Sequence, residues 1–172
     1  MAEGWGRIQL EVVTPERLVL SVEVDEISAP GALGYFGVLP GHTPFLTTLG
    51  LGEVGYRIGN QWDYLAITWG YAEVLPNKVT ILTETAEMAE EIDIERAERA
   101  KRRAEERLHE WSTAAVDIDF ERASIALQRA FIRLQVAQKR PPRTGMPRRP
   151  ETRERPPELV SPDERASSQR RQ

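Results

Sequence analysis

The chain has 172 residues, which suits one compact domain or a small domain with an accessory element and is too short for two full-sized enzyme domains. Cysteine is absent and only two histidines occur, so disulfide scaffolds, thiolate or histidine-cluster metal sites and cysteine nucleophiles are excluded. The net charge of −4 is uneven, because residues 1–91 hold 4 Lys+Arg against 13 Asp+Glu whereas residues 140–172 hold 9 against 5. This asymmetry indicates segments with different partners and does not by itself indicate nucleic acid.

Residues 5–88 have the period of β-structure. Apolar side chains alternate with their neighbours at Ile8, Leu10 and Val12, and again from Leu18 to Val24, so each strand has one buried and one solvated face. Short strands separated by turn residues predict an antiparallel sandwich or barrel. We expect strands at Ile8–Val13, Leu18–Val24, Tyr35–Leu39, Phe45–Thr48, Val54–Ile58, Trp62–Thr68, Tyr71–Leu75 and Val79–Thr83.

Residues 89–139 change to a helical period, which predicts two helices separated by residues 112–119, with Asp119 placed to cap the second. Alanine-rich stripes let two helices approach closely, so we expect an antiparallel hairpin. Because the stripes are narrow, we expect this hairpin to be weakly anchored and able to adopt more than one position. The first stripe is Ile94, Ala97, Ala100, Ala104, Leu108 and Trp111, and the second is Phe120, Ala123, Leu127, Ala130, Phe131, Leu134 and Ala137.

Residues 140–172 contain seven of the twelve prolines and nine arginines, with Leu159-Val160 as the only aliphatic pair. Such a segment cannot bury enough apolar surface to offset the entropy of ordering, so we expect a disordered tail. No apolar run in the chain approaches the roughly 20 residues of a membrane-spanning helix, so we expect no such segment.

Residues 30–44 hold four glycines and three prolines among apolar side chains, a composition typical of a stiff, partly apolar loop. Two interpretations remain open from composition alone. The loop is either a tight connection between strands or a rigid docking edge for another protein. The second interpretation follows from its apolar composition, because exposed apolar surface commonly marks a site where a partner binds. His42 has no carboxylate, serine or second histidine near it in the sequence, which favours a packed or hydrogen-bonded loop residue over a catalytic one.

No catalytic centre is predicted. Gly50, Gly52 and Gly55 match the spacing of a dinucleotide fingerprint, but a strand continues where that motif requires a helix. The serines lie in no nucleophile-elbow motif. Four carboxylates before the helices have the pattern of an exposed charge run: Glu84, Glu87, Glu90 and Glu91.

Arginines crowd both predicted helices, and Asp93 is a suitable N-cap for the first of them. Facing guanidinium groups could hold a triphosphate, because they bind phosphate in a bidentate manner. They could equally bind an acidic protein surface, or they could be solvated surface residues without a binding role. The positive residues are Arg96, Arg99, Lys101, Arg102, Arg103 and Arg107 on the first helix and Arg122, Arg129 and Arg133 on the second.

Residues 37–45, which read GVLPGHTPF, resemble the GVLPGHxP loop of the epsilon subunit of the bacterial rotary proton-translocating ATP synthase. The segments IQLEVVTPE at 8–16, WGYAEV at 69–74 and VTIL at 79–82 occur in the expected order, and IDIERA at 92–97 resembles the opening of the family's hairpin. The resemblance covers about residues 6–139. It implies an N-terminal antiparallel β-sandwich of about ten strands at 5–88 and a C-terminal antiparallel two-helix hairpin at 89–139, with the disordered tail at 140–172 outside the usual pattern.

The resemblance implies a non-catalytic central-stalk subunit that joins the gamma subunit to the c-ring and couples proton translocation to ATP synthesis. Its membrane contact would be indirect, at the cytoplasmic face of the bacterial plasma membrane. The hairpin would inhibit ATP hydrolysis by reaching the alpha and beta subunits. The implied c-ring and gamma contacts are Leu33, Tyr35, Phe36, Val38, Leu39, Pro40, His42 and Pro44.

The resemblance implies no required cofactor and no metal, but some family members bind a regulatory ATP in the hairpin. The alternative from a different class is a free-standing nucleotide-sensing module that uses the hairpin alone, and tight binding to a gamma subunit would discriminate between the two. The positions that match the ATP-binding pattern are Ile92, Asp93, Arg96, Ala97, Arg103, Arg129 and Arg133.

Overall fold

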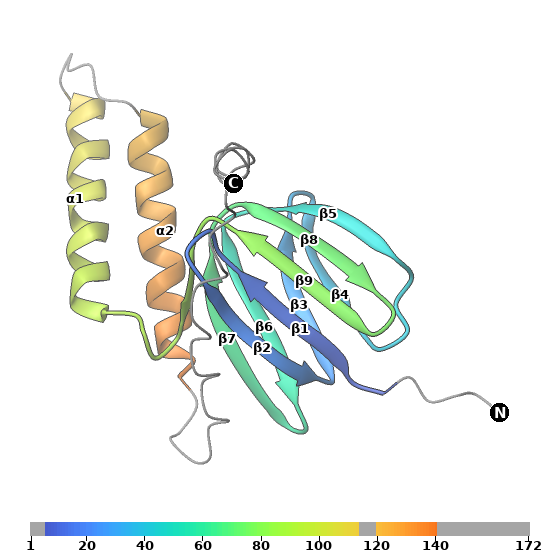
Figure 1. The fold of residues 1–172 in the computed structure, drawn as a ribbon. Helices are drawn as coiled ribbons and strands as arrows, with labels where there is room; N and C mark the ends of the chain where they lie inside the picture. Colours follow the sequence, from blue (N-terminus) through green and yellow to red (C-terminus); the bar gives the residue numbers. More distant parts are fainter. Residues whose placement is uncertain (1–5, 114–119, 141–172) are drawn as a thin grey trace, which may run out of the picture.

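The computed structural model describes residues 6–113 and 120–140, which form ten strands followed by two helices (Figure 1). This architecture confirms the predicted fold class. The expected cap Asp119 and the expected tail beyond Arg140 lie outside the described residues. The elements are β1 (Ile8–Val13), β2 (Leu18–Val24), β3 (Glu26–Gly31), β4 (Gly34–Val38), β5 (Phe45–Leu49), β6 (Gly52–Ile58), β7 (Gln61–Ile67), β8 (Gly70–Leu75), β9 (Lys78–Thr83), β10 (Ala86–Met88), α1 (Ile94–Thr113) and α2 (Phe120–Gln138).

All ten strands belong to one sheet that curls into two facing layers, in the order β10-β7-β6-β3-β5-β8-β9-β1-β2, with β4 beside β3. Neighbouring strands are antiparallel, as expected, with one exception: β1 runs parallel to β9, and Leu10 lies opposite Val79. The predicted alternation decides which side chains form the core. Ile8, Leu10 and Val12 are fully buried, while the residues between them are half-buried.

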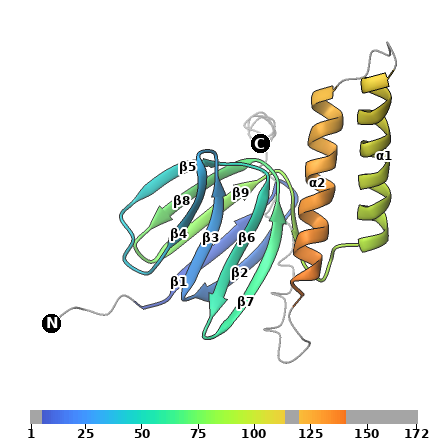
Figure 2. The same ribbon diagram turned by 180° about the vertical axis from the view of Figure 1, so that it is seen from behind.

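The two helices pack side by side, and α2 lies between α1 and the sandwich in both views (Figures 1 and 2). The buried seam consists of alanines, as predicted, and a Cβ methyl at each position allows the backbones to approach closely. The larger apolar side chains of the predicted stripe lie at its flanks, since Phe120 and Phe131 are half exposed. The buried alanines of the seam are Ala97 and Ala104 on α1 and Ala123 and Ala130 on α2. Ala137 is also buried, but against the sandwich.

The first turn of α1 is capped as expected. The backbone N–H of Arg96 donates to Asp93 Oδ1 at 2.9 Å, which satisfies one of the donors that a helix leaves open at its start. In the part of the chain that the structure describes, neither helix is long and apolar enough to cross a membrane.

Candidate functional site

The turn between β3 and β4 presents an apolar rim. Leu33 is completely exposed, and Tyr35 and Leu39 are each more than half exposed. Gly34 has a φ of +131°, a backbone angle that other residues rarely adopt, and it closes the turn that carries Leu33. Pro44 is also exposed, so four of the eight predicted contact residues are open to a partner.

The other predicted contact residues have a different setting. Val38 is fully buried, so its side chain cannot reach a partner. Phe36 packs against the core and meets Phe45 edge to face, with 5.6 Å between the ring centroids. Pro40 and His42 are half-buried. These four residues lie beside the rim, whose exposed side chains are Leu33, Tyr35, Leu39 and Pro44.

Hydrogen bonds fix the loop that follows β4. The backbone N–H of Gly41 donates to the carbonyl of Pro76 at 2.7 Å, which ties the loop to the β8–β9 turn. His42 Nδ1 lies 2.7 Å from the carbonyl oxygen of Thr43, and its backbone N–H donates to Leu39. His42 is therefore a hydrogen-bonded loop residue, as the sequence predicted.

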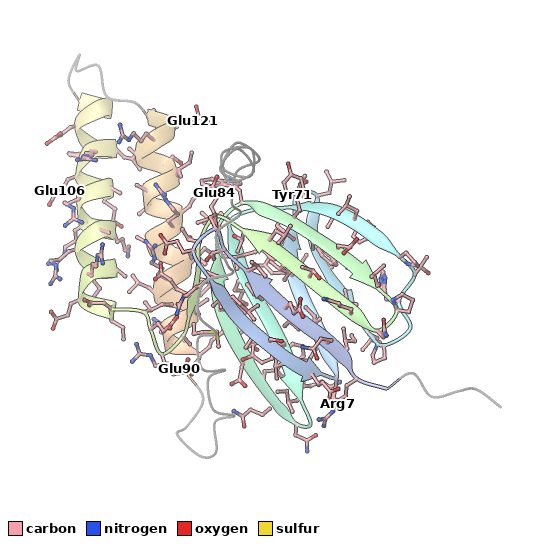
Figure 3. All side chains as sticks on the ribbon, viewed as in Figure 1. Arg7, Tyr71, Glu84, Glu90, Glu106 and Glu121 are labelled. Carbon is pink, nitrogen blue, oxygen red and sulfur yellow. The ribbon has the colours of Figure 1, made fainter. Side chains whose placement is uncertain are left out.

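A second apolar surface, which the sequence analysis missed, lies on the outer face of β5, β8 and β9. Tyr71 lies opposite Thr48 on one side and Leu82 on the other, and more than half of Tyr71 and Leu82 is exposed. Figure 3 shows Tyr71 on the outside of the sandwich. These side chains border a groove of about 680 Å³ whose lining includes Val13, Pro15, Thr48, Trp69, Tyr71 and Leu82. We call it the outer groove.

The hairpin is docked on the sandwich through the C-terminal half of α2. Val136 is fully buried there, and Ala137 is nearly so. Both belong to one apolar cluster with residues from β7 and from the linker between β10 and α1, namely Ala66, Ala89 and Ile92, with Tyr64 and Ile132 packed against it.

Charged contacts surround this cluster. Arg133 donates from Nε to Glu87 Oε1 at 2.8 Å and from a terminal nitrogen to the same oxygen. Lys139 Nζ donates to Glu53 Oε1 at 2.5 Å and lies 4.4 Å from the centroid of the Tyr64 ring. Arg140, the first residue of the predicted tail, donates to the backbone carbonyls of the linker at 2.8 and 2.6 Å.

The predicted charge run is only partly a solvated face. Glu84 and Glu90 are exposed (Figure 3), in agreement with the sequence analysis. Glu87, in contrast, is half-buried and binds Arg133 of α2. Glu91 is exposed, as predicted, and also accepts two hydrogen bonds from Arg17 in the β1–β2 turn. Their partners lie 46 and 74 residues away in the chain, which is why local sequence carried no signal for these pairs.

The predicted ATP-binding residues lie in several environments. Ile92 and Ala97 are buried, and Asp93 caps α1. Arg96 and Arg103 are exposed and lie seven residues apart, on one face of α1. Arg129 and Arg133 are half-buried and four residues apart, on one face of α2, and the guanidinium of Arg133 is already held by Glu87. Among the described residues, no cluster of acidic or histidine side chains could hold a metal ion.

The fold and these surfaces define a protein with two exposed apolar surfaces on a β-sandwich and a helical hairpin docked beside it. Residues 7–89 match the family model of the ATP synthase delta/epsilon chain β-sandwich domain, and residues 90–138 match that of its long α-helix domain. The chain belongs to the ATP synthase delta/epsilon chain family, and it has the two domains of an epsilon chain, a non-catalytic subunit.

Curated relatives agree over most of this chain. ATP synthase epsilon chain 2 of Syntrophotalea carbinolica is 55% identical over 131 residues, which cover 76% of this chain and 94% of the relative. The ATP synthase epsilon chain of Geotalea uraniireducens is 54% identical over 133 residues, covering 77% and 95%. A chain in the mitochondrial ATP synthase of Euglena gracilis, solved with OSCP, F1 and the c-ring, superimposes with a TM-score of 0.65 at 26% identity, covering 77% of this chain and 82% of that one.

Proposed function

We propose that this subunit belongs to the central stalk, where it joins the gamma subunit to the c-ring and so couples proton translocation to ATP synthesis. The observation that carries the proposal is the pair of apolar surfaces on the sandwich, the β3–β4 rim and the outer groove. Exposed apolar patches of this kind mark interaction sites. The Euglena gracilis neighbour comes from an assembly with F1 and a c-ring, which supports partners of this type. The subunit would then be peripheral, at the cytoplasmic face of the bacterial plasma membrane.

The two surfaces suit two partners. At the rim, Leu33 extends fully exposed from a glycine-closed turn, which suits an apolar contact with the c-ring. The outer groove is lined in part by the aromatic rings of Trp69 and Tyr71, which suits an apolar segment of gamma. Aromatic side chains at the centre of an interface commonly contribute most of its binding free energy.

Binding to the partners tests this proposal. Leu82→Glu places a charge in the outer groove, and we expect it to weaken gamma binding by roughly thirtyfold or more, the effect of losing about 2 kcal/mol at a central contact. Leu33→Asp would instead weaken c-ring binding and leave gamma binding intact. Gln61→Glu, at the exposed start of β7, is the control for added charge. The proposal fails if both apolar variants bind gamma and the c-ring as the wild type does.

The hairpin is proposed to inhibit ATP hydrolysis by leaving the sandwich and reaching the alpha and beta subunits. Support comes from the small size of the docking cluster, in which Val136 is the largest fully buried side chain that α2 contributes. The chain has no cysteine, so a pair introduced at Ala66 and Val136 can be crosslinked without competing thiols. We expect the crosslinked subunit to bind the enzyme without inhibiting hydrolysis, and a reductant to restore inhibition. Full inhibition by the crosslinked form would refute this role.

Regulatory ATP is proposed to bind at the arginines of the hairpin. Arg96 and Arg103 fit such a site by their exposure and spacing on α1, and the half-buried Arg129 would contribute from α2. Arg133 fits only if a phosphate displaces Glu87. ATP titration by calorimetry tests the site, with Arg103→Ala and Arg129→Ala as the variants that should lose binding. ATP binding without any binding to gamma would favour the alternative, a free-standing nucleotide-sensing module.

A further inference from the structure

The charged contacts of the docked hairpin are concentrated at one end of α2. Two cations six residues apart meet two carboxylates from different strands. Arg133 of α2 binds Glu87 of β10, and Lys139, just after the end of α2, binds Glu53 of β6. Each of these four side chains is about one-fifth to one-third exposed, so water screens the pairs less than it screens pairs on the open surface.

Glu53 is the more constrained of the two carboxylates. One oxygen binds Lys139, and the other, Oε2, is buried with no hydrogen-bond partner in the described part of the chain. The ammonium of Lys139 also lies over the ring of Tyr64. If α2 moved away, this carboxylate would lose its counter-ion, which costs free energy until water reaches it.

We propose that the pairs Glu87–Arg133 and Glu53–Lys139 form an electrostatic latch that holds the hairpin on the sandwich without bound nucleotide. The apolar cluster beneath them is small, so the free energy of these pairs adds measurably to that of the cluster. The hairpin position therefore depends on ionic strength and on anions that compete for Arg133. The proposal deepens the regulatory part of the proposed function, on which it rests, yet it concerns the isolated chain and is tested there.

The distance between hairpin and sandwich reports the latch directly. Because the chain lacks cysteine, Asn60→Cys at the β6–β7 turn and Glu106→Cys on α1, the outer helix (Figure 3), accept a pair of fluorescent or spin labels specifically. We expect Glu87→Gln and Lys139→Met each to lower the ratio of docked to released hairpin by about threefold or more. Raising NaCl from about 0.05 M to about 1 M should release the wild-type hairpin and have less effect on the variants.

A matched control is available inside the sandwich. Arg57 pairs with Glu26 at 3.0 Å, and the exposures of this pair, 29% and 34%, resemble the 34% and 32% of Arg133 and Glu87. Glu26→Gln removes a comparable ion pair away from the hairpin and should leave the distance unchanged. Glu87→Arg and Arg133→Glu should each abolish docking when made alone, because each places two like charges side by side. The double variant exchanges the two charges and should recover docking.

Three results would overturn the latch: equal distances in Glu87→Gln and Glu26→Gln, a distance that salt does not change, or no recovery in the exchanged pair. Circular dichroism of each variant separates release of the hairpin from loss of the fold. Failure of the subunit to bind gamma would refute the proposed function and leave these distance measurements unaffected, so the two failures are distinguishable.

Discussion

Truncating Val136 should shift the hairpin from its docked to its released position without unfolding the sandwich. Val136 is fully buried in the cluster between α2 and the sandwich. Val136→Ala removes two methyl groups, each worth about 0.8 kcal/mol, and it leaves a cavity that adds to the loss, for a total of about 2 kcal/mol. Since about 1.4 kcal/mol corresponds to a tenfold change, the released population should rise roughly thirtyfold.

Thiol labelling of a cysteine under the hairpin measures that population. Ala66→Cys provides the thiol, because Ala66 lies on β7 in the same cluster and is only 7% exposed. In this background we expect Val136→Ala to speed labelling about thirtyfold, in proportion to the released fraction. Val74→Ala is the control, since Val74 is fully buried in the core of the sandwich and outside the cluster. Equal labelling rates in the two variants would refute the reasoning.

Gly70→Ala should destabilise the sandwich by about 2 kcal/mol and lower its urea midpoint, since the added Cβ would lie 1.9 Å from a backbone carbonyl oxygen of β9. At the control position, Gly50, an added Cβ meets nothing within 4 Å, so Gly50→Ala should leave the urea midpoint unchanged. Asp93→Ala removes the cap of α1 and should cost about 1 kcal/mol, visible as lower helix content on heating. A hydrogen bond from the backbone N–H of Gly59 lowers the pKa of Asp25 below its ordinary 3.8. The ionised carboxylate of Asp25 therefore stabilises the fold above pH 3.8. This contribution is lost as the pH falls through the lowered pKa of the folded state. Asp25→Asn should therefore weaken the acid-induced loss of stability below about pH 4, and an unchanged acid-unfolding curve would contradict this.

The period of the sequence was sufficient to predict eight of the ten strands and both helices, because a strand or helix that buries one face repeats apolar residues at its own period. Strand β3 was missed because it ends in Pro30-Gly31, a pair that typically marks a turn. Here the strand continues through both residues, and Pro30 lies opposite Tyr35 of β4. Strand β10 has only three residues, too few for alternation to be visible.

The exposed apolar surfaces could be predicted only where the chain is locally unusual. The glycine and proline spacing of residues 30–44 marked the β3–β4 rim, but it did not reveal that Val38 points into the core. The outer groove carried no such mark. Tyr71 and Leu82 are apolar like the buried residues beside them, and only the register of β8 with β9 brings the two together on the solvent side.

The position of the hairpin follows from two unequal interfaces. The seam between α1 and α2 buries alanines seven residues apart on each helix, Ala97 and Ala104 on α1 and Ala123 and Ala130 on α2, so the two helices are held together at several turns. The contact with the sandwich involves one end of α2 and combines a small apolar cluster with ion pairs that water and salt can replace. The weaker interface opens first, so the hairpin should move as one body about the linker at residues 89–93. A small free-energy difference between two positions is the condition under which a partner can select either of them.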